Sequence, residues 1–298
     1  MPNYNHAPYL RERLDSILAQ DYPNFEVILL DDASIDNSVT ILREYAKHPR
    51  VKAYILNDAN SGNTFLQWQR GLQQATGDYV WIAESDDVAC PNLLTKLVTA
   101  IEINKSVLVF CASNRIDEEG RIIPHRTDRT WKRGFCVEGK DFVRNFLLGY
   151  CYICNASAVV FRREAAMNVD FSMVQKYPAS GDRCFWIQMA MQGNVAYVPE
   201  PLNGFRQHTQ KVSGNAENRG INMQQDHEIY NLVKGHLELS KRQRQLICGY
   251  HWQAIHRSSV SPEGRKKAIG VWASEKEFCK WSYDLYMIHR LIEKVIPL

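Results

Sequence analysis

Hydrophobic positions in the first part of the chain alternate between two spacings. Leu10, Leu14 and Ile17 recur three or four residues apart, which predicts a helix, and an apolar run at 25–30 predicts the strand that follows. The pattern then predicts a helix over 36–45, a strand over 51–56, a helix around 65–72 ended by Gly77, and a strand over 79–83. Helices between strands imply crossover connections. We therefore expect an α/β fold with a mainly parallel, Rossmann-like sheet and helices on both faces.

The pattern changes in the second half of the chain. Further segments are predicted as strands over 157–161 and 195–198 and as a helix over 182–192. From about Asn222 onward the spacing is almost wholly helical. A polar stretch near residue 215 separates the two patterns, so we predict an α/β domain over 1–214 and a helical C-terminal extension over 215–298.

The composition is that of an ordinary globular protein. The 298 residues are 45% hydrophobic, which excludes disordered and fibrous classes. No run approaches the roughly 20 apolar residues that span a bilayer, and residues 1–6 lack the regions of a signal peptide, so we expect a cytoplasmic location. A Rossmann oxidoreductase requires a G-x-G-x-x-G turn, which is missing. The glycine-rich N-terminal phosphate loop of a nucleotidyltransferase is missing too.

The eight cysteines are scattered through apolar segments, which is typical of buried thiols in a reducing compartment. The spacing of Cys151 and Cys154 is that of half a zinc site or of a thioredoxin-like motif. A zinc site requires a second pair, and a thioredoxin-like motif requires a strand before it and a helix after it. Neither context is present, so we expect these two cysteines to lie in a buried strand.

The net charge is only +3, but it is unevenly distributed. Residues 215–298 contain 13 Lys and Arg against 9 Asp and Glu. This basic surplus could face anionic lipid or an acidic acceptor, and solvated helix faces explain it equally well.

Two acidic clusters directly follow predicted strands. Asp31 and Asp32 end one apolar run, and Glu84, Asp86 and Asp87 follow another. In such sheets ligands gather at the carboxyl ends of the strands. Adjacent carboxylates repel one another and usually need a cation, and a divalent ion can neutralise a diphosphate leaving group. A solvated loop in which Asp86 or Asp87 caps the following helix explains the same spacing.

Several segments together resemble the family 2 glycosyltransferases in order and spacing, over about the first 210 residues. These segments are Tyr4-Asn5, Leu30 to Asp36, Asn60-Ser61-Gly62, Gly77 to Val80, and Glu84 to Asp87 followed by Pro91. The resemblance implies a GT-A fold and an inverting transfer from a nucleotide-diphosphate sugar of UDP or dTDP type. It also implies that the acceptor is a hydroxyl of a glycan or a lipid-linked molecule. We expect no nucleic acid as a partner.

The resemblance also implies roles for individual residues. Asp32 matches the aspartate that hydrogen-bonds the nucleotide base, and Tyr4 lies in the segment that packs against the nucleotide. Asp86 matches the aspartate that binds Mn²⁺ or Mg²⁺. Glu84 stands where an aspartate is commoner, and it would contact the ribose or the metal ion.

Asp182 marks a second candidate site. An aspartate at the junction of a loop and a helix is ordinarily an N-cap. Gly181 and Asp182, followed by aromatic residues, nevertheless resemble the family segment that supplies the catalytic base. An inverting displacement needs a group that removes the proton of the acceptor hydroxyl. A carboxylate with an ordinary pKa of about 3.9 is ionised at neutral pH, so Asp182 is our candidate.

A third group follows the last predicted strand. Arg206, His208 and Lys211 resemble a family stretch whose histidine and basic residues can face the metal ion or the diphosphate. Imidazole is a competent metal ligand and arginine binds phosphate bidentately, so we expect His208 to bind metal and Arg206 to bind the nucleotide sugar. A surface loop explains the same residues. Trp131 lies in a polar stretch and is an exposed candidate for the acceptor site.

The resemblance has one departure. Family members open with an apolar strand before the segment that contains Tyr4, whereas Met1 stands where that strand ends. The departure suggests a truncated chain or a start codon assigned too late. It favours an alternative function, a weakened or inactive sugar-nucleotide-binding protein that lacks the first core strand. For the active enzyme, the basic extension suggests peripheral association with the inner face of a membrane.

Overall fold

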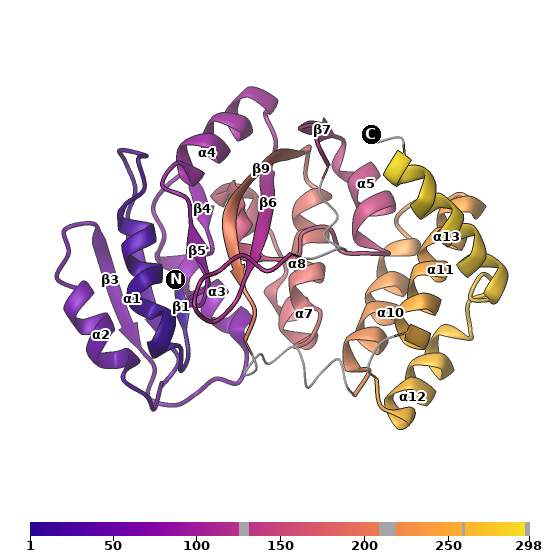
Figure 1. The fold of residues 1–298 in the computed structure, drawn as a ribbon, viewed down its shortest axis with the longest axis horizontal. Helices are drawn as coiled ribbons and strands as arrows, with labels where there is room; N and C mark the ends of the chain where they lie inside the picture. The colour runs from indigo at the N-terminus through magenta and orange to yellow at the C-terminus, as the bar shows by residue number, and fades with distance from the viewer. Residues whose placement is uncertain (125–130, 209–218, 258–259, 296–298) are drawn as a thin grey trace.

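The computed structural model describes residues 1–124, 131–208, 219–257 and 260–295 of the chain. Figure 1 shows strands in the middle of the N-terminal part with helices around them. The helices formed by residues 221–295 lie together at one end of the molecule (Figure 1).

The first sheet is small and parallel. It contains β1 (Pro2–Asn3), β2 (Val27–Asp31) and β3 (Val51–Leu56), in that order. The connecting helices α1 (Ala7–Leu18) and α2 (Ser38–Tyr45) share an apolar core with it, which includes Leu10, Leu14, Leu29, Ile41 and Leu42. Burial of such side chains contributes about 1.5–3 kcal/mol each and holds the crossover helices on the sheet. The predicted alternation is confirmed here, and β3 coincides with the predicted strand.

The second sheet is mixed. Its order is β4 (Tyr79–Trp81), β8 (Val159–Arg162), β6 (Leu108–Ile116), β9 (Val195–Arg206) and β5 (Val88–Ala89), with β7 (Phe135–Val137) also paired to β9. β6 and β9 run parallel, whereas β4 with β8, β6 with β8, β5 with β9 and β7 with β9 are antiparallel. The α/β class is confirmed, but the expected parallel order does not extend to this sheet. The regular alternation stops after the helix that ends at Asn104. The segment between β6 and β8 does not make a parallel crossover, so β8 runs in the opposite direction to β6.

The remaining helices flank the second sheet or form the C-terminal group. They are α3 (Thr64–Gln74), α4 (Leu93–Asn104), α5 (Gly139–Phe142), a π-helical segment (Val143–Leu147), a 3-10 turn (Ala156–Ala158), α6 (Arg163–Met167), α7 (Phe171–Lys176), α8 (Gly181–Ala190), α10 (Ile221–Lys234), α11 (Lys241–Arg257), α12 (Pro262–Trp272) and α13 (Lys280–Val295). The helical spacing after Asn222 is confirmed. The predicted boundary near residue 215 lies outside the described residues, so the division into two domains stays a prediction.

One large apolar core joins the C-terminal helices to the second sheet. It contains Phe65 of α3, Phe110 of β6 and Trp186 of α8 together with Tyr230 of α10 and Trp272 of α12. Within the described ranges, no helix is both long and apolar enough to cross a bilayer.

The eight cysteines are free thiols, but the expected burial holds only for Cys111, Cys184 and Cys248, because Cys90, Cys136, Cys154 and Cys279 are exposed. The prediction of a buried strand at Cys151 and Cys154 is wrong, because the segment is irregular and Cys154 is exposed. The thiol of Cys154 bonds the carbonyl of Cys151 (3.1 Å), and Asn155 then caps the 3-10 turn through the amide of Ser157. Local turn bonds of this kind compete with strand pairing.

His251 of α11 is a buried histidine in this core. Its ring stacks on Trp272 (centroids 4.0 Å apart), and its Nε2 lies 2.9 Å from the carbonyl oxygen of Leu148. Burial, aided by the charge of Arg183, lowers the pKa of His251 well below its ordinary value. The folded protein therefore contains the neutral imidazole, whose Nε2–H donates to Leu148.

This histidine predicts a loss of stability in mild acid. The unfolded chain binds a proton at His251 below about pH 6.5 and the folded chain does not, so the free energy of unfolding falls as the pH drops below that value. We expect a loss of about 1–2 kcal/mol between about pH 7 and pH 5.5. Urea unfolding of the wild type and of His251→Gln at both pH values measures it. If the free energy of unfolding depends equally on pH in the two proteins, His251 is not the group that causes the loss.

An apolar cavity of about 260 Å³ lies between β2 and β4, beside α3. Its lining includes Met1, Leu30, Trp68, Leu72 and Trp81. The amino group of Met1 donates a hydrogen bond to the carbonyl of Ile28 (2.8 Å). Burial lowers the pKa of this amine to about 5, although the charge of Glu84 opposes the change.

Candidate active site

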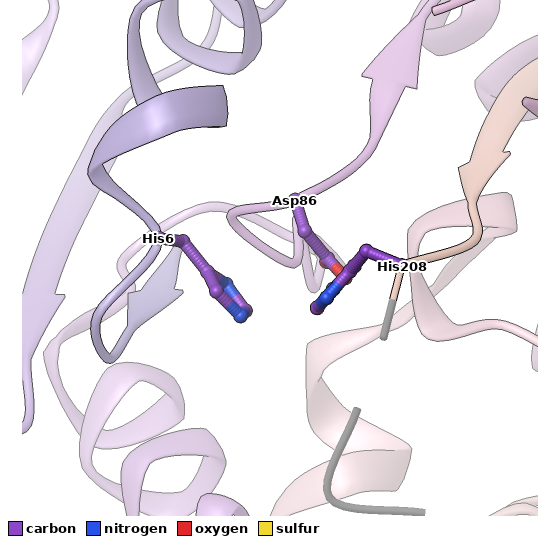
Figure 2. Close-up of side chains that lie close together, drawn as sticks. All are labelled: His6, Asp86 and His208. Carbon is purple, nitrogen blue, oxygen red and sulfur yellow. The ribbon is translucent and has the colours of Figure 1, made fainter. Parts of the chain in front are cut away.

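Three segments that are far apart in the sequence bring His6, Asp86 and His208 together (Figure 2). His6 precedes α1, Asp86 lies between β4 and β5, and His208 follows β9. The Nε2 of His208 is 3.1 Å from a carboxylate oxygen of Asp86. One ligand atom from each of the three half-buried side chains lies within 4.8 Å of the other two. Asp86 and His208 are thus neighbours, as expected, and His6 is a third member of the group.

The chemistry of this trio suits a divalent ion. Ligand atoms bound to one ion at about 2.1 Å are about 3–4 Å apart, so a small contraction would bring the three atoms into range. Two imidazoles and a carboxylate suit Mn²⁺ better than Mg²⁺, which prefers oxygen ligands. The Nδ1 of His6 is 2.8 Å from the hydroxyl of Ser85, a contact that orients the ring.

Sequence reasoning missed His6. Its only signal was its place directly after Tyr4 and Asn5, since a single histidine in a loop has no partner at metal-ligand spacing. Its two partners are 80 and 202 positions away in the sequence, and only the fold brings them near.

A phosphate-binding arginine has to face solvent, and Arg206 does not. It is completely buried at the end of β9. Its Nε donates to the carbonyl of Asp86 (2.7 Å) and its Nη1 to the carbonyls of Asp117 and Glu118 (2.9 Å each). Its Nη2 pairs with Glu12 of α1. The expectation of a nucleotide-sugar contact is therefore corrected: the guanidinium is used by protein acceptors and supports the backbone of Asp86.

Asp87 is also a structural residue, although not the helix cap that the sequence allowed. Its carboxylate accepts hydrogen bonds from the side chain of Asn155 (2.8 Å) and from the backbone N–H of Arg206 (3.0 Å). The helix that follows, α4, has Asn92 at its N-cap position. Asp87 therefore joins the acidic loop to β9 and keeps Asp86 near His208.

A buried cation balances the acidic loop. Arg13 of α1 is fully buried, lies over the ring of Trp81 (4.8 Å) and donates to the hydroxyl of Ser157 (3.1 Å). Burial and the charge of Asp86 raise the pKa of Asp87, and the charge of Arg13 opposes them. Sequence reasoning missed Arg13 too. The signal was a charged residue at helical spacing among Leu10, Leu14 and Ile17.

Glu84 points into the protein interior beside this loop. Its carboxylate accepts a hydrogen bond from the indole N–H of Trp68 (2.8 Å). Burial, followed by the charge of Asp86, raises the pKa of Glu84 to about 7. This carboxyl therefore keeps its proton to a higher pH than an ordinary exposed glutamate does.

Asp32 organises a neighbouring loop. Its buried carboxylate accepts hydrogen bonds from the side chains of Asn57 (2.6 Å) and Gln67 (2.9 Å) and from the N–H and hydroxyl of Ser61 (3.0 and 2.8 Å). A carboxylate offers about four acceptor positions, and these donors fill them. A nucleotide base that bonds Asp32 would have to displace one of them.

Tyr4 lies at the same edge of the first sheet and is 41% exposed. The loops after β1 and β2 are joined there, because Ser34 accepts from the N–H of Asn5 (2.9 Å) and Asn5 accepts from the N–H of Ile35 (2.8 Å). Asn5 and Ala33 have positive φ angles of 55° and 60°. Such backbone is unfavourable outside glycine and is typical of functional loops.

Asp182 lies in the first turn of α8, two residues after the N-cap residue Ser180. It is therefore not the N-cap of this helix. Its Oδ1 accepts from the N–H of Arg183 (2.7 Å), and burial raises the pKa of its carboxyl. A side chain at Gly181 would overlap the ring of Phe65 and the carbonyl of Val174, so close packing fixes the start of the helix.

The remaining two candidates have different outcomes. The prediction that Trp131 is exposed is wrong: it is half-buried in an aromatic cluster, stacks on Tyr152 (centroids 4.5 Å apart) and contacts Phe135 edge-on. Apolar partners distant in sequence surround Trp131, which its polar neighbours in the sequence did not indicate.

Lys211 lies outside the described residues.

Comparison with known proteins agrees with the resemblance. The model of glycosyl transferase family 2 matches residues 1–168. An uncharacterized protein of Mycobacterium tuberculosis is 29% identical over 264 residues, which are 83% of this chain and 70% of that protein. An uncharacterized glycosyltransferase of Haemophilus influenzae is 28% identical over 215 residues. These residues are 70% of this chain and 65% of that protein.

A solved structure shows the fold. Residues 1–349 of S. aureus TarS, in complex with UDP-GlcNAc, superpose with a TM-score of 0.70 at 17% identity. The match covers 96% of this chain and 82% of that one. The expected GT-A fold is confirmed.

Proposed function

Because this chain belongs to glycosyl transferase family 2, we propose that it transfers a sugar, with inversion, from a UDP- or dTDP-type donor to a hydroxyl of a glycan or lipid-linked acceptor. The observation that supports the proposal most is the trio of His6, Asp86 and His208 at the end of the acidic loop. It offers a cation site next to the loops that carry Tyr4 and Asp32.

In this proposal Asp86, His208 and His6 hold Mn²⁺ or, less suitably, Mg²⁺. When bound, the ion would neutralise the negative charge of the departing diphosphate. Arg206 bonds the backbone of Asp86, and Asp87 bonds the end of β9, which His208 follows, so these two bonds keep Asp86 and His208 in place. Tyr4 and Asp32 take the nucleotide, whereas Glu84 would have to leave the indole of Trp68 to contact the ribose or the ion.

Asp182 is the proposed base. It accepts the proton of the acceptor hydroxyl while that oxygen forms a bond to the anomeric carbon and the bond to the diphosphate breaks. Attack from the face opposite the diphosphate gives inversion. Burial raises the pKa of the carboxyl, which makes its ionised form a stronger base.

Metal-linked stabilisation tests the proposal directly. If the site is intact, UDP with MnCl₂ should raise the unfolding temperature, because a ligand that binds the native state stabilises it by mass action. We expect either component alone to have a smaller effect. No shift with any nucleoside diphosphate and Mn²⁺ would refute the binding part of the proposal.

The contribution of His6 is a sharper prediction. We expect His6→Ala to weaken Mn²⁺ binding about tenfold or more, because one of three protein ligands is lost. Calorimetric titration of UDP-saturated protein with MnCl₂ measures the change. The matched control is His236→Ala, since His236 is an exposed residue of the C-terminal part. Equal affinity of the His6→Ala variant and the control would remove His6 from the site.

A weakened or inactive sugar-nucleotide-binding protein is the second candidate. The observation that favours it is that two expected donor contacts are used inside the protein: Arg206 is completely buried, and Glu84 bonds the indole of Trp68. Screening a panel of nucleotide sugars for donor hydrolysis with Mn²⁺ separates the two candidates. Binding of UDP without hydrolysis or transfer of any donor would favour the second.

The acceptor part of the proposal includes contact with a membrane surface. Trp281, Ile288 and Leu291 of α13 are more than half exposed, at 67%, 55% and 62%. Apolar side chains on one helix beside basic residues such as Lys280 suit an anionic lipid surface. Cosedimentation with anionic and with neutral vesicles measures this association. Recovery of the same amount of protein in the supernatant with anionic and with neutral vesicles would contradict binding to an anionic surface.

A further inference from the structure

The short segment that contains Asp182 rests on α10, a helix of the C-terminal part. Three contacts join them: the N–H of Ala179 donates to the side chain of Gln225 (2.9 Å), the hydroxyl of Ser180 to the carbonyl of Asn222 (3.3 Å), and Arg183 pairs with Asp226 (3.1 Å). The residues on each side are consecutive or one helical turn apart. The segment is therefore held along its length by one face of α10.

The ion pair of Arg183 and Asp226 is the charged contact among these three. Both side chains are only 9% exposed. Arg183 also donates through Nη1 to the carbonyls of Leu147 and Gly149 (2.8 Å each). Breaking a buried pair by removing one partner leaves an uncompensated charge and is costly, so the pair strongly constrains the start of α8.

We propose that Asp226 is a positioning residue for sugar transfer: it holds Arg183, and through Arg183 the first turn of α8, so that Asp182 keeps its place in the active site. The inference rests on the proposed role of Asp182 as the base. It makes α10 part of the catalytic apparatus, although α10 lies beyond the predicted domain boundary.

The charges around Asp182 give this arrangement a measurable signature. Arg183 of α8, Asp226 of α10 and the thiol of Cys151 surround the carboxyl, and Tyr250 and His251 of α11 lie near Arg183. Burial raises the pKa of Asp182 most, Arg183 lowers it, and the charge of Asp226 raises it. Removing the charge of Asp226 should therefore lower the pKa of Asp182 and weaken the base.

The test is Asp226→Asn in the full chain, assayed by release of UDP from the UDP-sugar that reacts fastest in a donor panel. We expect kcat to fall about tenfold and the acid limb of the kcat profile to move to lower pH. The KM for the donor and the affinity for UDP with Mn²⁺ should stay unchanged. Asp226→Glu should restore the acid limb, because it restores the charge.

Two controls separate positioning from general damage. Glu228→Gln removes a carboxylate from the same helix, where Glu228 pairs with Lys176 at the surface, and should leave all parameters unchanged. Gln225→Ala removes an uncharged contact to the same segment and should lower kcat a few-fold without moving the acid limb. If Asp226→Asn does not fold, the Gln225→Ala variant decides. A lower kcat at constant KM in Gln225→Ala supports the inference, and a wild-type kcat in Gln225→Ala overturns it.

Asp182→Asn, assayed in parallel, distinguishes the two possible failures. If Asp182→Asn is inactive and a folded Asp226→Asn has wild-type kcat and an unmoved acid limb, the inference alone is overturned. Full activity of Asp182→Asn overturns the assignment of the base and the inference with it. Absence of reaction with every donor overturns the proposed function.

Discussion

Replacement of Asp182 by Asn is expected to reduce kcat for sugar transfer about a thousandfold, because a general base contributes on this scale and an amide cannot accept the proton. Asparagine has nearly the same shape, and its carbonyl can still accept from the N–H of Arg183. The unfolding temperature should therefore change little. Binding of UDP with Mn²⁺, measured by calorimetry, should stay within about twofold of the wild-type value.

The matched control for this prediction is Asp141→Asn. Asp141 is an exposed residue of α5 that pairs with Arg144 at the surface, so the same chemical change there should leave kcat unaltered. A fall in UDP affinity parallel to the fall in kcat would show that Asp182 binds the donor and is not the base. Full activity would remove it from both roles.

The second large effect concerns Gly139, the first residue of α5. A methyl group at this position would overlap the backbone carbonyl oxygens of Ala190 and Gly193. Backbone atoms at the end of α8 cannot move aside as a flexible side chain would. We expect Gly139→Ala to lower the free energy of unfolding by about 3 kcal/mol or more, measured by urea denaturation.

Gly270→Ala is the control for Gly139→Ala. Gly270 lies inside α12, and among the described residues no heavy atom outside the adjacent helix backbone lies within 4 Å of the position of an added Cβ. Alanine has the higher helix propensity, so this variant should gain about 0.5–1 kcal/mol. A loss below about 1 kcal/mol in Gly139→Ala would mean that α5 and α8 can separate without cost.

The fold was predictable where local pattern and topology agree. β3 was predicted at its observed bounds, and the helices after Asn222 were recognised from their spacing. The mixed order of the second sheet could not be predicted. Strand direction there depends on pairing between β6, β8 and β9, which are distant in sequence. Local periodicity contains no information on such pairings.

The site was predictable only in part, for a related reason. Asp86 and His208 were recognised by resemblance, and the fold brings them together. Arg206 was misinterpreted because a guanidinium suits both phosphate and buried carbonyl groups, and only its burial decides between them. His6 and Arg13 were missed because their roles depend on partners that other segments supply.

The apolar cavity between β2 and β4 has a practical consequence for activity assays. A small apolar additive or a detergent tail that enters such a cavity would contact Trp68, whose indole N–H bonds Glu84 of the acidic loop. Comparisons of activity should therefore be made in buffers with the same additive and detergent content.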